Sequence, residues 1–80
     1  MNSKENLTDY QLEQLRLLGE KLRELRLRSG QKSYENFATE NGLNRANYGR
    51  YEKGANLRVS TLINILKAHN LSIEDLIKDL

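Results

Sequence analysis

Cysteine, proline and tryptophan are absent from this chain of 80 residues, and histidine occurs once, as His69. Without cysteine the chain forms neither a disulfide framework nor a thiolate metal site, and a lone histidine does not make a zinc site. We therefore expect no metal and no cofactor, and a core held together by packing alone. The absence of proline, with five glycines, 38% hydrophobic residues and 30% charged residues, indicates an all-helical soluble domain rather than a sheet or a disordered tail.

Long apolar runs are also absent, since none exceeds two or three residues. A membrane span needs roughly 18 apolar residues, and residues 1–5 lack the hydrophobic region of a signal peptide. We therefore expect a cytoplasmic protein that does not enter a membrane. We also expect a flexible lead over residues 1–7 and a single domain over residues 8–80, which leaves little space to bind a small-molecule ligand.

The first predicted helix is long and has one apolar face. Thr8 and Gln11 have the spacing of a capping box, and Gly30 predicts that the helix ends near Ser29. The apolar face carries Leu12, Leu15, Leu18, Leu22 and Leu25, and the opposite face carries Glu13, Arg16, Glu20, Arg23 and Glu24. About six turns exceed what so small a domain needs. The surplus at Leu12 and Leu15 would pack either on the C-terminal helix or on a second copy of the protein.

Two short helices joined by a glycine turn are predicted next. Ser33 is a capping residue that predicts a helix over residues 33–40, and Gly42 supplies the left-handed residue that ends it. The inward residues of this helix are Phe37 and Ala38. Asn44 caps a third helix over residues 44–53, which Gly54 ends. Two helices joined by three or four residues around a glycine have the geometry of a helix-turn-helix.

Two further helices complete the prediction. One extends from about Val59 to His69, with Asn70 as a left-handed cap, and the other follows the capping box of Ser72 and Asp75. Their inward residues are Leu62, Ile65 and Leu66 in the former and Ile73, Leu76, Ile77 and Leu80 in the latter. The predicted fold class is thus all-α: a compact five-helix domain with a helix-turn-helix and an extended first helix.

Positive charge is concentrated around the third helix. Residues 1–30 carry six basic and five acidic side chains, residues 31–60 five and three, and residues 61–80 two and three. From Leu43 to Arg58, four basic side chains face one acidic residue, Glu52, which gives this segment a net charge of +3. A concentration of positive charge on one helix and the following loop favours binding to nucleic acid.

The third helix divides its side chains as a helix in the DNA major groove requires. Tyr48 and Tyr51 fall on the packing face, and the donors of hydrogen bonds fall on the other side: Asn44, Arg45, Asn47 and Arg50. Arg45, in the first turn, matches the O6 and N7 acceptors of guanine with two parallel hydrogen bonds. We therefore expect Arg45 to bind a base edge.

The other residues of this segment have less determined roles. Asn47 would bond a base edge or a phosphate, and Ala46 offers at most a methyl contact to thymine. Arg50 is either a second base-contacting residue or a phosphate clamp. Lys53 and Arg58 are long cations near the helix end and in the following loop, and we expect them to anchor phosphates.

Gly49 has two possible explanations, and His69 has none of the partners that catalysis would need. Gly49 lies inside the third helix, where glycine costs about 1 kcal/mol relative to alanine; either its missing side chain lets DNA approach closely, or an adjacent helix crowds the position. His69 is predicted to lie at a helix end and to interact with the terminal carbonyls. No nucleophile, second histidine or glycine-rich phosphate loop accompanies it, so we expect no enzyme.

From about Leu18 to Leu76 the chain resembles the Xre/Cro-type helix-turn-helix family of phage repressors and their bacterial relatives. The matching residues are Leu22, Leu25, Arg26, Phe37-Ala38, Gly42, Tyr51-Glu52-Lys53-Gly54 and Thr61-Leu62. The resemblance implies a lambda-repressor-like fold, a homodimer, and base contacts from the start of the third helix. It further implies phosphate contacts from the start of the second helix and the loop after the third.

The resemblance also assigns individual residues. It implies that Ser33, Tyr34 and Asn44 bind phosphates beside Lys53 and Arg58, and that Arg26 and Glu52 form a partly buried ion pair. The chain departs from the family at Tyr34, where many members have glutamine, and in the loop after the third helix, where Asn56-Leu57-Arg58-Val59 stands in place of a common proline.

The function that these features predict is sequence-specific binding of double-stranded DNA, as a transcriptional regulator that reads the major groove with the third helix. The alternative is a protein interaction module on the same scaffold, with DNA binding lost or secondary. A structural RNA-binding role is weaker, because A-form RNA hides its major groove from side chains.

Overall fold

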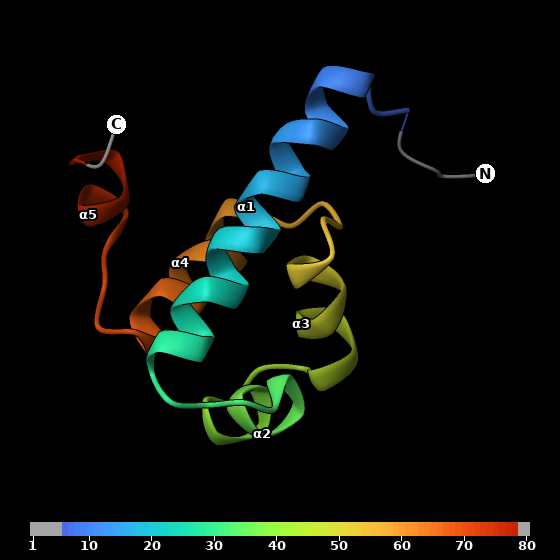
Figure 1. The fold of residues 1–80 in the computed structure, drawn as a ribbon. Helices are drawn as coiled ribbons and strands as arrows, with labels where there is room; N and C mark the ends of the chain where they lie inside the picture. Colours follow the sequence, from blue (N-terminus) through green and yellow to red (C-terminus); the bar gives the residue numbers. More distant parts are fainter. Residues whose placement is uncertain (1–5, 79–80) are drawn as a thin grey trace.

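Five helices and no strand make up the part of the chain that the structure, a computed structural model, describes, which is residues 6–78. They are α1 (Asp9–Arg28), α2 (Tyr34–Glu40), α3 (Arg45–Glu52), α4 (Val59–Ala68) and α5 (Ile73–Lys78). In Figure 1, α1 crosses in front of α4, with α3 on one side, α5 on the other and α2 near its C-terminal end. The expected all-α fold with an extended first helix is confirmed; residues 1–5 of the predicted lead, and Leu80, lie outside the described residues.

The predicted capping residues begin the helices. Side-chain oxygens of Thr8, Ser33, Asn44 and Ser72 accept hydrogen bonds from the backbone N–H three residues later, at 2.9 to 3.2 Å. These bonds satisfy amides that have no partner within the helix. Gly42 and Asn70 take the expected left-handed backbone, with φ of 70° and 59°, after α2 and α4. The first four helices therefore have the predicted boundaries to within one or two residues.

The core is a small cluster that draws on α1 to α4. Its buried residues are Leu22, Phe37, Ala38, Tyr48 and Ile65, and Leu66 is also buried. Tyr51 was expected in the core together with Tyr48, but it is only half-buried and packs against the cluster from outside. The face of α1 opposite the core is exposed, as predicted. Only one side of the helix-turn-helix thus packs against α1 and α4.

The backbones of α1 and α3 meet at Gly19, which the sequence analysis did not single out. A Cβ atom at this buried position would lie 2.6 Å from the carbonyl oxygen of Tyr51 and 2.7 Å from that of Glu52. Contacts this short are not tolerated, and backbone atoms cannot turn away as the end of a side chain can. Glycine at position 19 is therefore what lets the C-terminal end of α3 lie directly on α1.

An ion pair fixes the same crossing. Arg26 of α1, which is 4% exposed, donates from Nε and Nη2 to the two carboxylate oxygens of Glu52 at 2.7 and 2.9 Å. Its Nη1 donates to the carbonyl oxygens of Gln31 and Lys32 at 2.9 and 2.8 Å. The hydrogen bonds to Glu52 raise the pKa of the Arg26 guanidinium. The expected ion pair is present, and it also holds the connection between α1 and α2.

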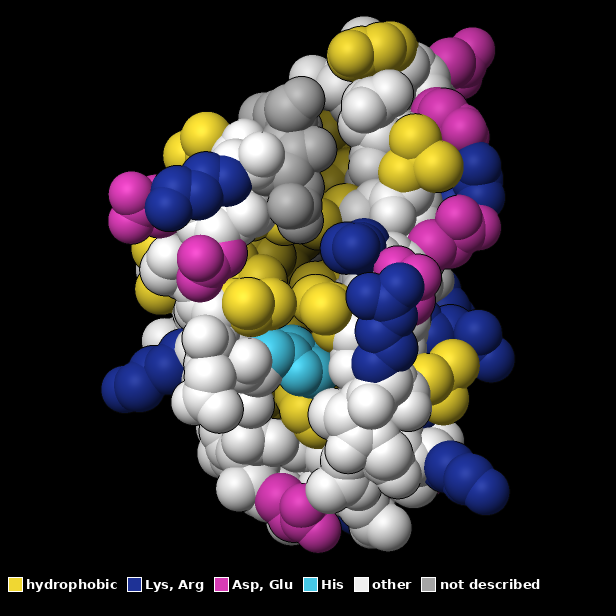
Figure 2. All heavy atoms as spheres, turned by 60° about the vertical axis from the view of Figure 1, so that its left-hand side comes forward, with side chains coloured by type: hydrophobic (Ala, Val, Ile, Leu, Met, Phe, Trp, Pro, Cys, Tyr) yellow, Lys and Arg dark blue, Asp and Glu magenta, His cyan; other side chains and the backbone are white. Residues whose placement is uncertain are grey.

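The last helix packs more loosely than predicted. No residue of α5 is fully buried, and Ile77, expected on the buried side, is 57% exposed, so that prediction is wrong. A hollow of about 180 Å³ lies between α1 and α5 and is lined by Lys21, Leu25, Arg28, Leu66, Leu71, Asp75 and Leu76. Figure 2 shows hydrophobic side chains exposed in a hollow on this side of the molecule.

The N-terminal half of α1 projects beyond the rest of the fold (Figure 1). Leu12 is 48% exposed and Tyr10 is 73% exposed, so α5 does not cover them, because it lies opposite the C-terminal half of α1. Leu12 therefore does not pack on the C-terminal helix, which was one of the two partners predicted for it. Within residues 6–78, no helix combines the length and apolar character that crossing a membrane requires.

His69 follows the last residue of α4, as predicted, but its ring does not bind the terminal carbonyls. The imidazole stacks on Phe37 with ring centroids 4.9 Å apart and an interplanar angle of 16°. Its Nε2 is buried and has no hydrogen-bond partner among the described residues. Burial lowers the pKa of His69 below its ordinary value, against a weaker opposing effect of the Glu52 carboxylate. His69 therefore behaves as a neutral core residue.

Removing the carboxylate of Glu52 tests the ion pair. Glu52→Gln would leave the Arg26 guanidinium buried without a counter-charge, so the free energy of unfolding should fall by about 3 to 5 kcal/mol. Urea denaturation followed by circular dichroism measures this change. Glu24→Gln, which breaks the exposed pairs with Lys21 and Arg28, is the matched control and should unfold close to wild type. Equal denaturation midpoints for Glu52→Gln and wild type would contradict the role given to the pair.

His69 predicts a loss of stability in mild acid. Its folded pKa lies below the ordinary value of 6.5, so below about pH 6.5 the unfolded chain binds a proton that the folded protein does not. The free energy of unfolding should therefore be constant with respect to this group above pH 6.5 and should decrease as the pH falls from there. Melting temperatures of wild type and His69→Phe between about pH 7.5 and 5 provide the comparison. Parallel curves for the two proteins would exclude the histidine as the cause.

Candidate nucleic-acid interface

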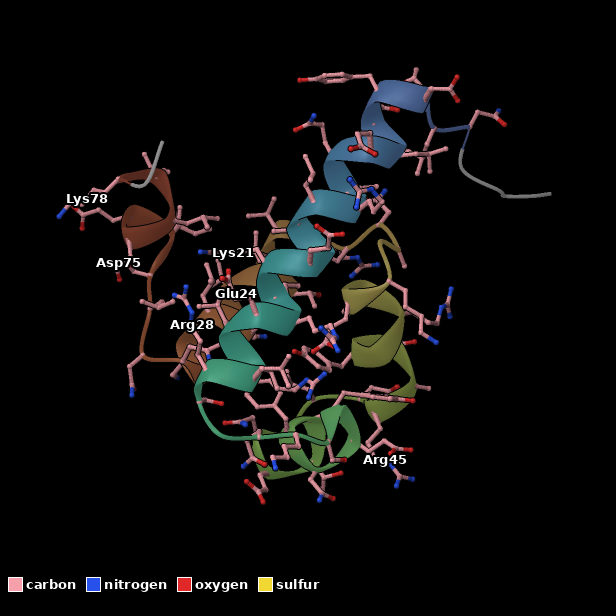
Figure 3. All side chains as sticks on the ribbon, viewed as in Figure 1. Lys21, Glu24, Arg28, Arg45, Asp75 and Lys78 are labelled. Carbon is pink, nitrogen blue, oxygen red and sulfur yellow. The ribbon has the colours of Figure 1, made fainter. Side chains whose placement is uncertain are left out.

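The outer face of α3 is open to solvent. All of the predicted base-contacting residues, Arg45, Ala46, Asn47 and Arg50, are exposed, and so is Lys53 at the helix end. Tyr48 and Gly49 are buried on the other side, Tyr51 is half-buried, and the side chain of Glu52 is almost fully buried. Arg45 lies at the N-terminal end of α3 and points away from the body of the molecule (Figure 3). The helix therefore has one side in the protein and one side free for a ligand.

Most acidic side chains of α1 are paired, whereas the cations around α3 are not. Three of the four acidic residues of α1 pair with cations of the same helix: Glu13 and Glu20 with Arg16, and Glu24 with Lys21 and Arg28. Four cations around α3 form no ion pair with any described residue, namely Arg45, Arg50, Lys53 and Arg58. The acidic residue of this segment, Glu52, is turned inward to Arg26. The free positive charge of the helix-turn-helix is consequently on its exposed side.

The capping residues next to this face keep hydrogen-bond donors available. Ser33 accepts from the Asn36 amide through Oγ, and Asn44 accepts from the Asn47 amide through Oδ1. A cap uses an oxygen lone pair, so the serine hydroxyl hydrogen and the asparagine NH₂ remain to donate. Neither group donates to another described residue. Both helix starts can thus still donate to an anion.

Gly49 is crowded by a neighbouring helix. A Cβ atom built at position 49 would lie 2.5 Å from Cε1, 3.0 Å from Cζ and 3.1 Å from Cδ1 of Tyr34, the first residue of α2. Of the two explanations predicted for Gly49, the structure therefore shows crowding by an adjacent helix. It also explains how Tyr34 fits where a smaller side chain was expected, because the ring occupies the space that a residue at position 49 would need.

Arg58 lies farther along the chain, before α4. It occupies the position that caps α4, yet the helix has no side-chain cap. A hollow of about 660 Å³ beside it is lined by Tyr51, Asn56, Leu57, Arg58 and Thr61. The first amides of α4 and the exposed Arg58 thus lie at the edge of the space between α3 and α4.

The predicted site residues fall into three groups in the structure. Arg45, Ala46, Asn47, Arg50 and Lys53 share α3, with Asn44 as its cap. Ser33 and Tyr34 lie at the start of α2, where the Tyr34 ring contacts Gly49 of α3. Arg58 stands apart, at the start of α4. Among the described residues, no group of three or more histidine and acidic side chains could hold a metal ion.

The chain was compared with known protein families, curated proteins and solved structures. The helix-turn-helix domain family matches residues 17–80, which is 64 of the 80 residues. No curated protein and no solved structure matches. The family match includes α2, the turn at Gly42 and α3, together with most of α1. The chain therefore belongs to the helix-turn-helix domain family.

Proposed function

We propose that this protein is a transcriptional regulator of the Xre/Cro type that binds double-stranded DNA sequence-specifically, with α3 in the major groove. The observation that carries the proposal is the exposed side of α3, which presents amides and cations that form no ion pair with a described residue, while the tyrosines of the helix pack inward. Helix-turn-helix domains that bind DNA place their second helix in the major groove. The proposal includes a cytoplasmic location and no enzymatic activity.

The base contacts are assigned to the first two turns of α3. Arg45 donates two hydrogen bonds to the O6 and N7 atoms of a guanine, and Asn47 bonds a neighbouring base edge or a phosphate. Arg50, on the same exposed side of the helix, binds a second base or clamps a phosphate. Ala46 contributes at most a methyl contact to thymine. The short, exposed side chain of Ala46 lets the backbone of α3 come close to the groove.

The phosphate contacts surround these base contacts on both sides. Ser33 and Asn44 donate from groups that their capping bonds leave unused, and Tyr34 donates through its hydroxyl. Lys53 and Arg58 neutralise phosphates at the other end of α3 and before α4. Phosphate contacts fix the register of the protein on the duplex, and the base contacts then select the sequence.

The exposed apolar residues on the projecting end of α1 favour a second role, self-association. Tyr10 and Leu12 are 73% and 48% exposed, and Leu17 is 44% exposed. A single module with five or six phosphate contacts binds weakly at physiological salt, and a dimer places two α3 helices in successive major grooves about 34 Å apart. We propose that the end of α1 contributes to a homodimer. A protein interaction module without DNA binding remains the alternative function.

A salt titration with random-sequence duplex DNA tests the proposed function. Wild type should bind at about 50 mM salt and lose most of its affinity by about 200 mM. Arg45→Ala and Arg50→Ala should each weaken binding about tenfold or more, because each removes a charge-assisted contact. Fluorescence anisotropy of a labelled duplex measures both effects.

Arg28→Ala is the matched control for these variants. It removes the same charge from an exposed arginine that lies on the other side of the molecule from Arg45 (Figure 3). Its affinity for the duplex should stay within about twofold of wild type. If wild type shows no salt-sensitive binding, and the α3 variants behave like Arg28→Ala, the interaction module becomes the better account.

The dimer is tested by sedimentation equilibrium. Replacing Tyr10 and Leu12 together by serine removes exposed apolar area without touching the core, so the variant should keep its melting temperature and sediment as a monomer at concentrations where wild type is dimeric. A wild type that stays monomeric at all concentrations, or a variant that dimerises equally well, would contradict a role for this end of α1.

A further inference from the structure

The turn between α2 and α3 contains the pair Asn41-Gly42, the only place in the sequence where glycine follows asparagine. Both residues are exposed. A backbone nitrogen can attack the side-chain amide of the preceding asparagine, and glycine hinders this attack least because it has no Cβ. A Cβ built on Gly42 would meet nothing within 4 Å, so the surroundings of the turn are open as well. The turn therefore combines a reactive pair of residues with access for water.

The other asparagines of the chain are each followed by a larger residue: serine, leucine, phenylalanine, arginine, tyrosine or isoleucine. Asn70 is the closest comparison, because it is exposed and lies in the turn after α4. Leu71 follows it, and the Leu71 backbone nitrogen donates to the carbonyl oxygen of Leu66 at 2.9 Å. The attacking nitrogen is thus both shielded and firmly bonded at Asn70.

At Asn41 two hydrogen bonds keep the reacting groups apart. Nδ2 of Asn41 donates to the carbonyl oxygen of Phe37 at 2.8 Å, and the backbone nitrogen of Gly42 donates to that of Thr39 at 3.3 Å. The second bond is long, so the nitrogen that has to attack is weakly held. With ψ of 14° at Asn41, this nitrogen is turned away from the side chain. Opening the last turn of α2 would free both groups, and a helix end opens at a lower free energy than the whole fold.

We infer that Asn41 is a deamidation site of the folded protein, reached through local opening of the turn between α2 and α3. The nitrogen of Gly42 gives up its proton, and its lone pair forms a bond to Cγ of Asn41. The bond from Cγ to Nδ2 then breaks, and ammonia leaves with the proton. Water adds to either carbonyl carbon of the resulting succinimide and opens the ring, which gives aspartate or isoaspartate. Water is the only co-reactant, and nothing is oxidised or reduced.

The products do not fit the turn as asparagine does. A carboxylate cannot donate to the carbonyl oxygen of Phe37, and a negative charge is unfavourable at the C-terminal end of α2. Isoaspartate also lengthens the backbone between α2 and α3 by one methylene group. Deamidation would therefore loosen the junction that orients α3. The inference does not depend on the proposed function, because it is measured without DNA.

Peptide mass spectrometry after incubation at mildly alkaline pH measures the conversion of each asparagine. Asn41 should convert before all the others, with Asn70 as the matched internal control. The turn is permanently open in concentrated urea, so Asn41 should there convert about ten- to a hundredfold faster than in the native protein. Equal rates would show that the turn does not have to open, and a ratio above about a thousandfold would show that only global unfolding exposes the site. Either result would overturn the inference.

Gly42→Asn tests the attacking nitrogen. Asparagine tolerates the φ of 70° at this position, and its Cβ would meet no neighbour, so the variant should keep the backbone of the turn. The added side chain shields the nitrogen, so conversion of Asn41 should largely disappear. Conversion at the wild-type rate would contradict the mechanism. If the variant does not fold, the comparison is made between the two chains in urea, where the shielding persists.

Asn41→Asp reproduces one product and tests the consequence for the fold. It removes the donor to Phe37 and places a charge at the end of α2, so the melting temperature should fall by about 4 to 8 °C. Wild type that has been incubated until Asn41 is converted should show the same loss. An unchanged melting temperature in both samples would overturn the role given to the Asn41 side chain in this turn.

Discussion

The guanidinium of Arg26 lies where three parts of the fold meet: α1, the connection from α1 to α2, and the C-terminal end of α3. The guanidinium and the carboxylate of Glu52 are both almost fully buried, so each depends on the other for charge compensation. Gly19 lies about two turns before Arg26 along α1, on the side where α3 meets it, and allows the backbone contact that brings Glu52 into reach. Burying this one acidic residue has an electrostatic consequence. The remaining charge of α3 is entirely positive and faces solvent.

The exposed surface of α3 is therefore a product of how the helix is held. α2 contacts α3 through Tyr34 and Gly49 on one flank, and α1 holds its end, while the side with Arg45, Asn47 and Arg50 has no role in the core. Pre-organisation of this kind lowers the cost of binding, because little has to be ordered when a ligand arrives. The loosely packed α5 and the projecting end of α1 lie away from this surface (Figure 1) and carry exposed apolar residues.

Much of the fold could be predicted because local signals agree with one another. The caps at Thr8, Ser33 and Asn44, and the left-handed turn at Gly42, are determined by residues close in the sequence. Predictions failed where the burial or the contacts of a side chain depend on residues far away in the sequence. Ile77 has the right spacing for a buried face, but it is exposed, and no residue of α5 is fully buried. The ring of His69 finds Phe37 across the fold rather than the carbonyls beside it. The Xre/Cro resemblance pointed to the partner of Arg26, whereas no pattern indicated what Gly19 or Gly49 would touch.

The separation of inward and outward residues on α3 has a consequence for how such a protein changes its target. Arg45, Ala46, Asn47 and Arg50 are exposed, so under the proposed function substitutions among them would alter operator preference while thermal stability stays about the same. Position 49 is not free to change in this way, because a side chain there would meet the ring of Tyr34, and Tyr34 would have to be replaced at the same time. Under the proposed function, retargeting by evolution or by design should thus proceed through the four exposed positions.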